Sequence, residues 1–484
     1  MPKALFLKPS MGPRARSVVR DFVYGCWCNG RRVGGMQVPP INDLFVVTHC
    51  RVHGLDVDFL DAQLEPERFD ALMSAGMTDY AAVVLMTSTQ SFRADADVLG
   101  AIKAVNPTVR GVLYGSHPTF MPEACLQDSR VDHIVLREPE ESMRELLAAI
   151  FSGRSAAGIP GTGMRHDGKC VLGPPREFMD MDDLPIPDRG LLPHGSDYFN
   201  PVVERMPYTT MQTSRGCPGK CIFCTAPSFY GKRVRCRSAG KVVEELEVIK
   251  NLGYREVMFR DETFTAYKDR NRAICEEMLS RRLDLSWIAN ARVDCIDKDT
   301  MRLMRRAGCH LLKFGVETGS DDLLRTYRKG TTVAQAREAF RWAREVGLDT
   351  HAHIVFGGPG ETPQTMANTI EFVKELEATT ASFGILTPYP GTPLFDMVAR
   401  QGAAIGDGTG SNMQNLHVEG FFSEKICGLS GAELSSWVTR AYRRFYLRPG
   451  YLLRRLASVR SKDKLMALSI AGINVMRFAI TGEK

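Results

Sequence analysis

The segment "YTTMQTSRGCPGKCIFC", residues 208–224, runs from a short strand-like stretch into three closely spaced cysteines. Cys217, Cys221 and Cys224 follow a C-x3-C-x2-C spacing, which lets three sulfurs wrap one side of a metal centre. A structural zinc ion needs a fourth ligand, which Cys236 would have to supply. An iron–sulfur cluster held by three thiolates instead leaves one iron open for a further ligand. The spacing alone favours the cluster and leaves zinc, or no metal, as alternatives.

Apolar stretches of strand length recur from residue 206 to about residue 400, with helix-length intervals between them. Helical signals fill these intervals, since Val242, Leu246 and Ile249 share one helix face and Thr332 with Gln335 forms a capping box. The alternation predicts a parallel (β/α)6 partial TIM barrel, whose chemistry lies on loops at the carboxyl ends of the strands. The expected strands are 208–214, 255–262, 285–292, 310–319, 349–358 and 381–389.

A second alternation of strands and helices occupies the first 150 residues. Apolar runs at 3–9, 55–62, 80–88, 110–116 and 131–138 are separated by helix-sized intervals, as in a parallel sheet covered on both faces. This predicts an α/β fold with an N-terminal doubly wound, Rossmann-like domain. Ligands of such sheets bind beyond the carboxyl ends of the strands, so the candidate loops are 87–92 and 114–120.

Composition shifts suggest the domain boundaries. We expect a Rossmann-like domain at 1–150, a Gly- and Pro-rich linker at 151–205, the barrel at 206–400 and a mostly helical basic region at 401–484. From residue 440 onward there are eleven Lys or Arg against two Asp or Glu, within a chain of net charge +6. Such a basic tail is either a solvated helix face or a surface for an anionic partner, including a membrane.

The cysteine content indicates the cellular compartment. The chain has 13 cysteines and shows neither a signal peptide nor an apolar run long enough to span a membrane. An odd number of scattered cysteines does not suggest a disulfide framework, so we predict a cytoplasmic protein whose clustered cysteines bind metal. Cys26 and Cys28 in "YGCWCNG" receive no specific role.

The motifs of the predicted barrel, taken in order, resemble those of the radical S-adenosylmethionine superfamily. The match runs from about residue 208 to residue 395 and begins with the three cysteines, which the resemblance makes ligands of a [4Fe-4S] cluster. It includes "FRDETFT", "NARVD", "FGVETGS", "FGGPGET" and "LTPYPGTPLF" at successive strand ends. Cys236 then falls outside the site. The resemblance implies S-adenosylmethionine contacts at Phe223, Asp261, Glu262, Arg292, Glu317, Gly357, Gly358 and Pro359.

The domain order resembles the cobalamin-binding subclass of this superfamily. The segment "GSHPTFMPE" and the loop "MTSTQSF" are similar to the cobalamin loops of that subclass. The Asp-x-His-x-x-Gly motif that supplies a cobalt ligand elsewhere is absent, and "REPEES" replaces the usual Gly-Glu-Gly-Glu, so His117 is expected to shape the loop that binds the cobalamin tail. The implied cobalamin contacts are Thr87, Ser88, Thr89, Tyr114, Gly115, Ser116, His117 and Pro118.

The resemblance implies an enzyme that cleaves S-adenosylmethionine to a 5′-deoxyadenosyl radical and uses cobalamin to methylate an unactivated carbon. A small-molecule or lipid-like substrate and an external flavodoxin- or ferredoxin-type electron donor are expected, and no nucleic acid. The alternatives are oxidative cyclisation, rearrangement or coupling by the same fold, a tRNA methylthiotransferase, and a non-enzymatic zinc-binding module. No general acid or base is required, so no further catalytic side chain is assigned.

Overall fold

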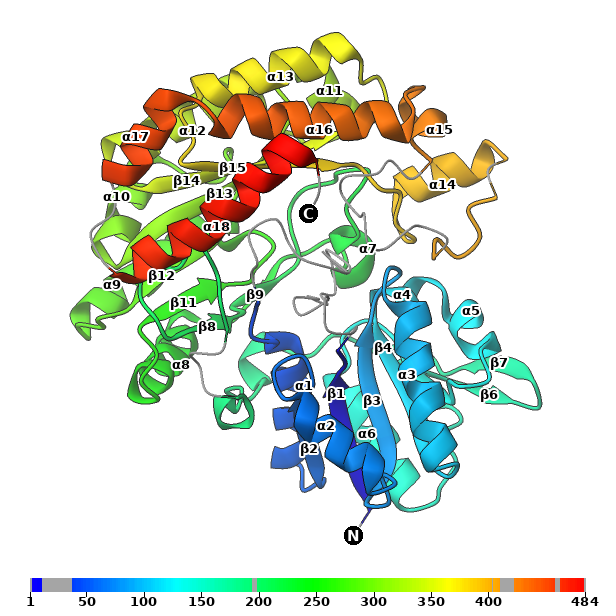
Figure 1. Ribbon diagram of the computed structural model, residues 1–484. Helices are drawn as coiled ribbons and strands as arrows, with labels where there is room; N and C mark the ends of the chain where they lie inside the picture. The colour runs from blue at the N-terminus through cyan, green and yellow to red at the C-terminus, as the bar shows by residue number, and fades with distance from the viewer. Residues whose placement is uncertain are drawn as a thin grey trace.

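The computed structural model describes residues 2–10, 37–193, 198–402, 404–409, 422–457 and 462–482. Within them the chain forms two α/β units followed by helices (Figure 1). Cys26 and Cys28 lie outside the described residues. No helix in the described part of the chain is both long and apolar enough to cross a membrane.

The N-terminal unit is built on a seven-stranded sheet in the order β2-β1-β3-β4-β5-β6-β7. Its first five strands pair in parallel, as predicted, and are β1 (Lys3–Lys8), β2 (Val57–Asp61), β3 (Tyr80–Thr87), β4 (Arg110–Gly115) and β5 (His133–Val135). Alternate residues of β1 point to opposite faces, because Phe6 belongs to one buried cluster and Leu5 to another. The sheet is therefore covered on both sides, which confirms the doubly wound domain.

Helices from the intervals between the strands cover the two faces. One buried cluster includes residues of α1 (Ile41–Val52) and α6 (Glu140–Phe151), and the other includes residues of α3 (Phe92–Val105) and α5 (Pro122–Gln127). The remaining helices of this unit are α2 (Pro66–Ser74) and α4 (Ser116–Phe120).

The region predicted as a linker contributes to the first sheet. Strands β6 (Thr162–His166) and β7 (Lys169–Leu172) form a hairpin that pairs antiparallel with β5. The Gly- and Pro-rich composition of this region marks its turns, but it does not exclude the short edge strands between them. The segment 162–172 is thus a correction to the predicted linker, and the domain boundaries themselves stay predictions.

The second unit is an open barrel of six parallel strands in the order β15-β14-β13-β12-β11-β8. All six predicted strands are present, as β8 (Tyr208–Met211), β11 (Glu256–Phe259), β12 (Ser286–Ala291), β13 (Cys309–Glu317), β14 (Asp349–Phe356) and β15 (Thr380–Ile385). The outer helices are α8 (Ala239–Asn251), α9 (Lys268–Ser280), α10 (Lys298–Arg306), α11 (Asp321–Thr326), α12 (Val333–Glu345) and α13 (Pro363–Glu375). Thr332 and Gln335 form the predicted capping box at the start of α12.

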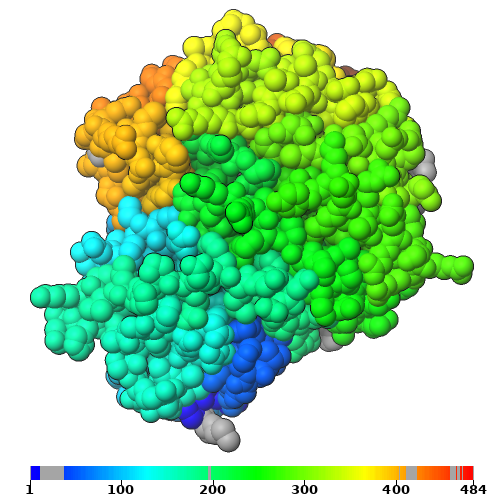
Figure 2. All heavy atoms as spheres, turned by 180° about the vertical axis from the view of Figure 1, so that it is seen from behind, coloured from blue at the N-terminus to red at the C-terminus, as the bar shows by residue number. Residues whose placement is uncertain are grey.

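The C-terminal region is helical, as predicted, and packs on the outside of the barrel. It comprises α15 (Ser423–Cys427), α16 (Gly431–Tyr446), α17 (Pro449–Ala457) and α18 (Lys462–Thr481). The helix before it, α14 (Pro393–Arg400), belongs to a separate buried cluster, against which Met121 and Phe223 pack. Leu434, Val438 and Phe445 of α16 join the buried cluster that covers β14 and β15. Seen from behind, the N-terminal unit and the barrel are pressed together, and orange residues near 400 lie against cyan ones (Figure 2).

Candidate active site

The three cysteines lie on the loop that leaves the first barrel strand. The chain passes from β8 through the short strand β9 (Ser214–Arg215), which pairs antiparallel with β10 (Arg235–Cys236), and the cysteine loop lies between these two strands. The amide of Ile222 donates to the carbonyl of Tyr327 at 3.0 Å, and the amide of Leu394 donates to the carbonyl of Ile222 at 2.9 Å. The loop is therefore fixed between distant parts of the barrel, and Cys236 belongs to the ribbon beside it.

The chemistry of this loop fits an iron–sulfur cluster. None of the three cysteines forms a disulfide. The Sγ atom of Cys217 lies 3.4 Å from the Gly219 amide and 3.2 Å from the Thr263 hydroxyl, the kind of polar contact that tunes cluster sulfurs. Burial raises the pKa of the Cys221 thiol, and the nearby charges of Lys329 and Arg292 oppose this rise without cancelling it. In the described part of the chain, no three or more His, Cys, Asp or Glu side chains converge as ligands of one metal ion.

Arg292 projects from the end of β12 toward the cysteine loop. Its Nε and Nη2 atoms donate to Asp294 at 3.0 and 2.8 Å, and Nη2 also donates to the Lys329 carbonyl at 2.9 Å. Its Nη1 atom is so near Gly219 that an added Cβ there would lie 2.8 Å from it. Burial disfavours the guanidinium charge, but Asp294 and the cysteine thiols Cys217 and Cys221 raise its pKa above the ordinary value. A fixed cation thus lies beside the cysteine loop, and the S-adenosylmethionine contact at Arg292 stays a prediction.

Glu317 ends β13 in a left-handed conformation, with φ of +67°. Such a conformation costs a non-glycine residue roughly 1 kcal/mol and is often found at functional sites. Its carboxylate accepts a 2.5 Å hydrogen bond from Nζ of Lys329, and both side chains are less than 10% exposed. Burial lowers the pKa of Lys329, but Glu317 and Cys221 raise it more. Lys329 was missed by the sequence reasoning, because no motif surrounds it.

The acidic pair after β11 divides into two different roles. Asp261 has no exposed surface, and its carboxylate accepts hydrogen bonds from the Thr213 amide and hydroxyl and from the Ser214 hydroxyl, at 2.5–2.7 Å. This carboxylate therefore positions the start of the cysteine loop, and the S-adenosylmethionine contact at Asp261 stays a prediction. Glu262 is half-buried and accepts a 2.9 Å hydrogen bond from the Gly216 amide, directly before the cysteines.

The glycine-rich turn after β14 packs on Tyr327. An added Cβ at Gly358 would lie 2.3 Å from the Tyr327 hydroxyl, so only glycine fits there without a shift. The Tyr327 hydroxyl donates to Glu361 at 3.0 Å, and the ring meets Phe223 edge-on with centroids 6.0 Å apart. Gly357 is buried with φ of +84°, and half-buried Pro359 follows. The structure thus brings Phe223 of the cysteine loop and the predicted glycine turn together around one tyrosine.

Two histidines on β14 form a polar layer that sequence reasoning missed. His351 contacts the hydroxyls of Thr380 and Ser382 at 2.7 and 3.1 Å, and His353 contacts Ser382 at 2.9 Å. Their neighbours on β14 pack outward into the barrel's hydrophobic core, so the histidines lie on the inner face. Burial lowers the pKa of His351 to about 3 and that of His353 well below its ordinary value, which favours the neutral form of both rings. The alternation in "HAHIVF" was the available signal.

The cysteine loop is also packed against the N-terminal domain. The helix α7 (Ala226–Tyr230), directly after Cys224, places Phe229 and Tyr230 in the same buried cluster as residues of β1, β3 and α6. Cys217 and Cys224 pack against this cluster as well. The two domains therefore share one hydrophobic core beside the three cysteines.

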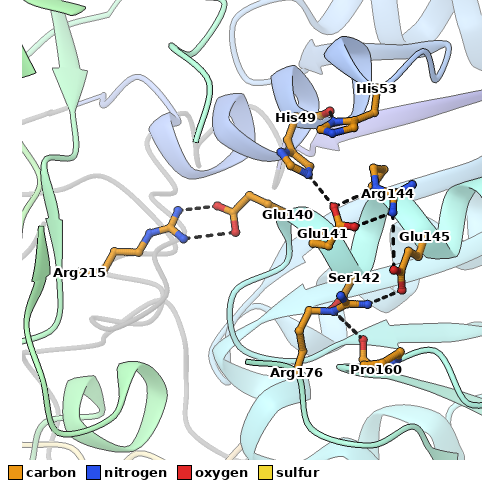
Figure 3. Close-up of polar contacts among 10 residues, drawn as sticks. All are labelled: His49, His53, Glu140, Glu141, Ser142, Arg144, Glu145, Pro160, Arg176 and Arg215. Atoms are coloured by element: carbon orange, nitrogen blue, oxygen red, sulfur yellow. Dashed lines mark hydrogen bonds and ion pairs between the residues drawn. The ribbon is translucent and has the colours of Figure 1, made fainter. Parts of the chain in front are cut away.

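A buried ion bridge reinforces this contact. Arg215 has no exposed surface and donates to Glu140 at 2.5 and 3.2 Å (Figure 3). It also donates to Glu138 at 3.0 Å, and Arg235 pairs with the same carboxylate. Both carboxylates come from "REPEES", the segment that departs from the subclass pattern. Arg215, two residues before the first cysteine, thus links the barrel to the N-terminal domain through ion pairs. The sequence carried no signal for this pairing across 75 residues.

The predicted cobalamin residues lie together at the carboxyl ends of β3 and β4. Gly115 has φ of +118°, and an added Cβ would lie 2.3 Å from the Thr87 carbonyl, so only glycine allows this close approach. The Tyr114 hydroxyl donates to Asp43 at 2.5 Å. Ser88, Thr89, Ser116 and Pro118 are also buried.

His117 has no exposed surface and connects these loops to the C-terminal region. Its Nδ1 atom contacts the Thr89 hydroxyl at 3.2 Å, whereas Nε2 makes no hydrogen bond and faces Asp407 at 3.8 Å. Burial lowers the pKa of His117 to about 4, against the opposing charge of Asp407. Small residues at the ends of two parallel strands, with one buried ring nitrogen that lacks a hydrogen-bond partner, fit the tail of a cobalamin.

Comparison with known proteins supports both halves of the chain. Residues 31–147 match the model of the B12 binding domain and residues 211–373 that of the radical SAM superfamily. An uncharacterized methyltransferase of Pyrococcus horikoshii is 32% identical over 428 residues, covering 88% of this chain and 91% of its own. The anaerobic magnesium-protoporphyrin IX monomethyl ester cyclase of Rubrivivax gelatinosus is 28% identical, covering 87% of this chain and 76% of its own.

Among solved structures, the radical S-adenosylmethionine methyltransferase TsrM from Kitasatospora setae, with cobalamin and a [4Fe-4S] cluster bound, has the same fold. Its TM-score is 0.67 at 19% identity, covering 84% of this chain and 76% of its own. The chain therefore belongs to the cobalamin-dependent radical S-adenosylmethionine enzymes. Its cofactors are a [4Fe-4S] cluster, S-adenosylmethionine and cobalamin.

Proposed function

We propose that this enzyme methylates an unactivated carbon of a small-molecule or lipid-like substrate. The observation that carries the proposal is the packing of Cys217 and Cys224 against the core of the cobalamin-binding domain. When bound, the cluster and S-adenosylmethionine supply a carbon radical, and cobalamin supplies the methyl group. A shared core beside the cysteines favours a substrate held between the two cofactor sites.

The side chains of the barrel orient the cofactors and exclude water. Cys217, Cys221 and Cys224 hold the cluster, and the cations of Arg292 and Lys329 balance its negative charge. Glu317, Glu262 and Phe223 contact S-adenosylmethionine, with the turn at Gly357, Gly358 and Pro359 allowing close backbone approach. Burial of these groups strengthens each polar contact and protects a radical from solvent.

The printed name of the Pyrococcus relative supports methyl transfer, and that of the Rubrivivax relative supports a second candidate. The second candidate is oxidative cyclisation by the same fold. The two reactions leave different products of S-adenosylmethionine, because methyl transfer releases S-adenosylhomocysteine and cyclisation does not. An external electron donor of the flavodoxin or ferredoxin type would serve either reaction, since cleavage of the sulfonium consumes an electron.

Anaerobic reconstitution tests the proposal without knowledge of the substrate. The protein is loaded with iron, sulfide and cobalamin, reduced in the presence of S-adenosylmethionine, and the products are measured by mass spectrometry. We expect S-adenosylhomocysteine that depends on cobalamin. Formation of 5′-deoxyadenosine with no S-adenosylhomocysteine would overturn methyl transfer and favour cyclisation.

A matched pair of variants separates cluster chemistry from general damage. Cys221→Ala removes a proposed cluster ligand, whereas Cys236→Ala removes a cysteine of the adjacent ribbon. Iron content and both products should fall in the first variant and persist in the second. Equal iron content in both variants would contradict the assignment of the cluster.

A further inference from the structure

Exposed large apolar side chains gather on the last two helices. Of the fifteen such residues in the described chain, eight lie between residues 452 and 480, so their distribution is far from even. On α17 they are Leu452, Leu453 and Leu456, and on α18 they are Leu465, Ile470, Ile473, Met476 and Ile480. We call these eight residues the C-terminal apolar face. Concentrated exposed apolar surface marks an interaction site more often than chance exposure.

Exposed apolar residues recur on one side of α18, where the exposed Ser469 lies between Leu465 and Ile473. Leu465, Ile473, Met476 and Ile480 follow each other at spacings of eight, three and four residues, which places them along one side of the helix. The opposite side of α18 packs on α16. There Phe478 is 1% exposed, and its ring meets that of Tyr442 edge-on with centroids 5.0 Å apart. Figure 1 shows α18 lying against the outside of the barrel beside α16. Among its described residues, α18 thus has apolar side chains both where it packs on the barrel and where it is exposed.

The C-terminal segment that contains these helices and the end of α16 carries a strong positive charge. Eleven Lys or Arg and two Asp or Glu follow residue 439, a net charge of +9. Arg454 is exposed between the exposed leucines of α17. On α16, Arg440 is exposed and lies 4.7 Å over the ring of Trp437. Apolar side chains mixed with arginine and tryptophan are typical of helices that lie in the membrane interface.

We propose that the C-terminal apolar face docks on the surface of an anionic lipid bilayer. Charge decides between this occupant and a second copy of the chain, because two copies would bring two segments of +9 together. An anionic headgroup layer attracts the same charge. The helix α18 lies along the surface, since Phe478 packs on the barrel and Arg443 donates to the carbonyls of Ala479 and Ile480 at 3.0 and 3.3 Å. Docking would bring the enzyme to lipid-like substrates.

Vesicle flotation of the full chain tests the proposal. One set of vesicles contains phosphatidylcholine with phosphatidylglycerol, and the other contains phosphatidylcholine alone. We expect flotation with the anionic vesicles only, and loss of binding as the salt concentration rises. The triple variant Leu453→Ser, Leu456→Ser, Ile473→Ser should weaken binding by about tenfold or more, because it removes three side chains that are each at least 62% exposed.

A control variant removes comparable side chains elsewhere. Val52→Ser with Leu252→Ser changes two apolar residues that are 62% and 53% exposed at the ends of α1 and α8, and should leave flotation unchanged. No flotation of the unmodified chain, or an equal loss in both variants, would overturn the proposal. So would a dimer, detected by light scattering, that the triple variant dissociates. Flotation requires no turnover, so its failure is distinguishable from failure of methyl transfer.

Discussion

Replacing Arg215 with alanine should destabilise the contact between the two domains. The guanidinium has no exposed surface and pairs with Glu138 and Glu140, whose side chains are 6% and 1% exposed. Removing one partner of a buried ion pair leaves an uncompensated charge and typically costs about 3–5 kcal/mol. Arg235 still pairs with Glu138, so the uncompensated charge lies on Glu140.

The pH dependence of this loss follows from Glu140. Burial raises its pKa, but Arg215 lowers it more, so the folded-state pKa lies below the ordinary 4.5. The ion pair therefore stabilises the fold above that value and ceases to do so as the pH falls through the folded-state pKa. The difference in stability between the unmodified chain and Arg215→Ala should be largest near neutral pH and shrink in acid.

Glu141→Gln provides the control on the same helix. Glu141 is adjacent to Glu140, is 24% exposed and pairs with Arg144 and His49 inside the N-terminal domain (Figure 3). Its loss should cost at most about 1 kcal/mol. Anaerobic denaturation monitored by intrinsic fluorescence gives the loss of unfolding free energy for each variant. The iron content reports on the nearby cysteine loop. Equal destabilisation by the two variants would refute the reasoning.

Three further predictions concern the barrel. Cys217→Ala should abolish the cluster absorbance of the reconstituted protein, whereas Cys295→Ala should keep it; a cluster retained in the first variant would contradict the ligand assignment. Gly358→Ala should cost about 1–3 kcal/mol of stability through its clash with a buried tyrosine, whereas Gly240→Ala meets nothing within 4 Å and should be neutral or stabilising in thermal denaturation. Burial raises the pKa of Glu361 from 4.5 to about 7, so the stability that this carboxyl contributes is lost as the pH rises from 4.5 to 7. Glu361→Gln should remove about 3 kcal/mol of this pH dependence of the unfolding free energy. Parallel pH profiles of stability for the two proteins would refute this prediction.

The order of strands and the place of the chemistry could be predicted, because both depend on local patterns. Apolar runs at strand length located every parallel strand of both sheets, and the cysteine spacing identified the loop after β8. Asp261 shows the limit of local patterns: an acidic residue after a strand suggests a ligand contact, but the pattern does not reveal that Thr213 and Ser214 donate three hydrogen bonds to its carboxylate. Such pairing depends on distances between strand ends, which spacing along the chain does not encode.

Contacts between the domains could not be predicted from the sequence for the same reason. Arg215 and Glu140 are 75 residues apart and read singly as surface charges, although both are buried. Lys329 pairs with Glu317 across a helix and has no motif around it. The hairpin at 162–172 was missed because its strands are short and lie among glycines and prolines.

The placement of Phe229 and Tyr230 bears on how such enzymes can be re-engineered. These rings belong to the barrel by sequence but fill the interior of the neighbouring domain. In a chimera of this barrel with a foreign cobalamin domain, Phe229 and Tyr230 would lack the matching core in which they are buried here. The N-terminal domain, transferred without α7, would have a cavity where these rings pack. Exchange of domains between family members should therefore succeed only when α7 is transferred together with the cobalamin-binding domain whose core it fills.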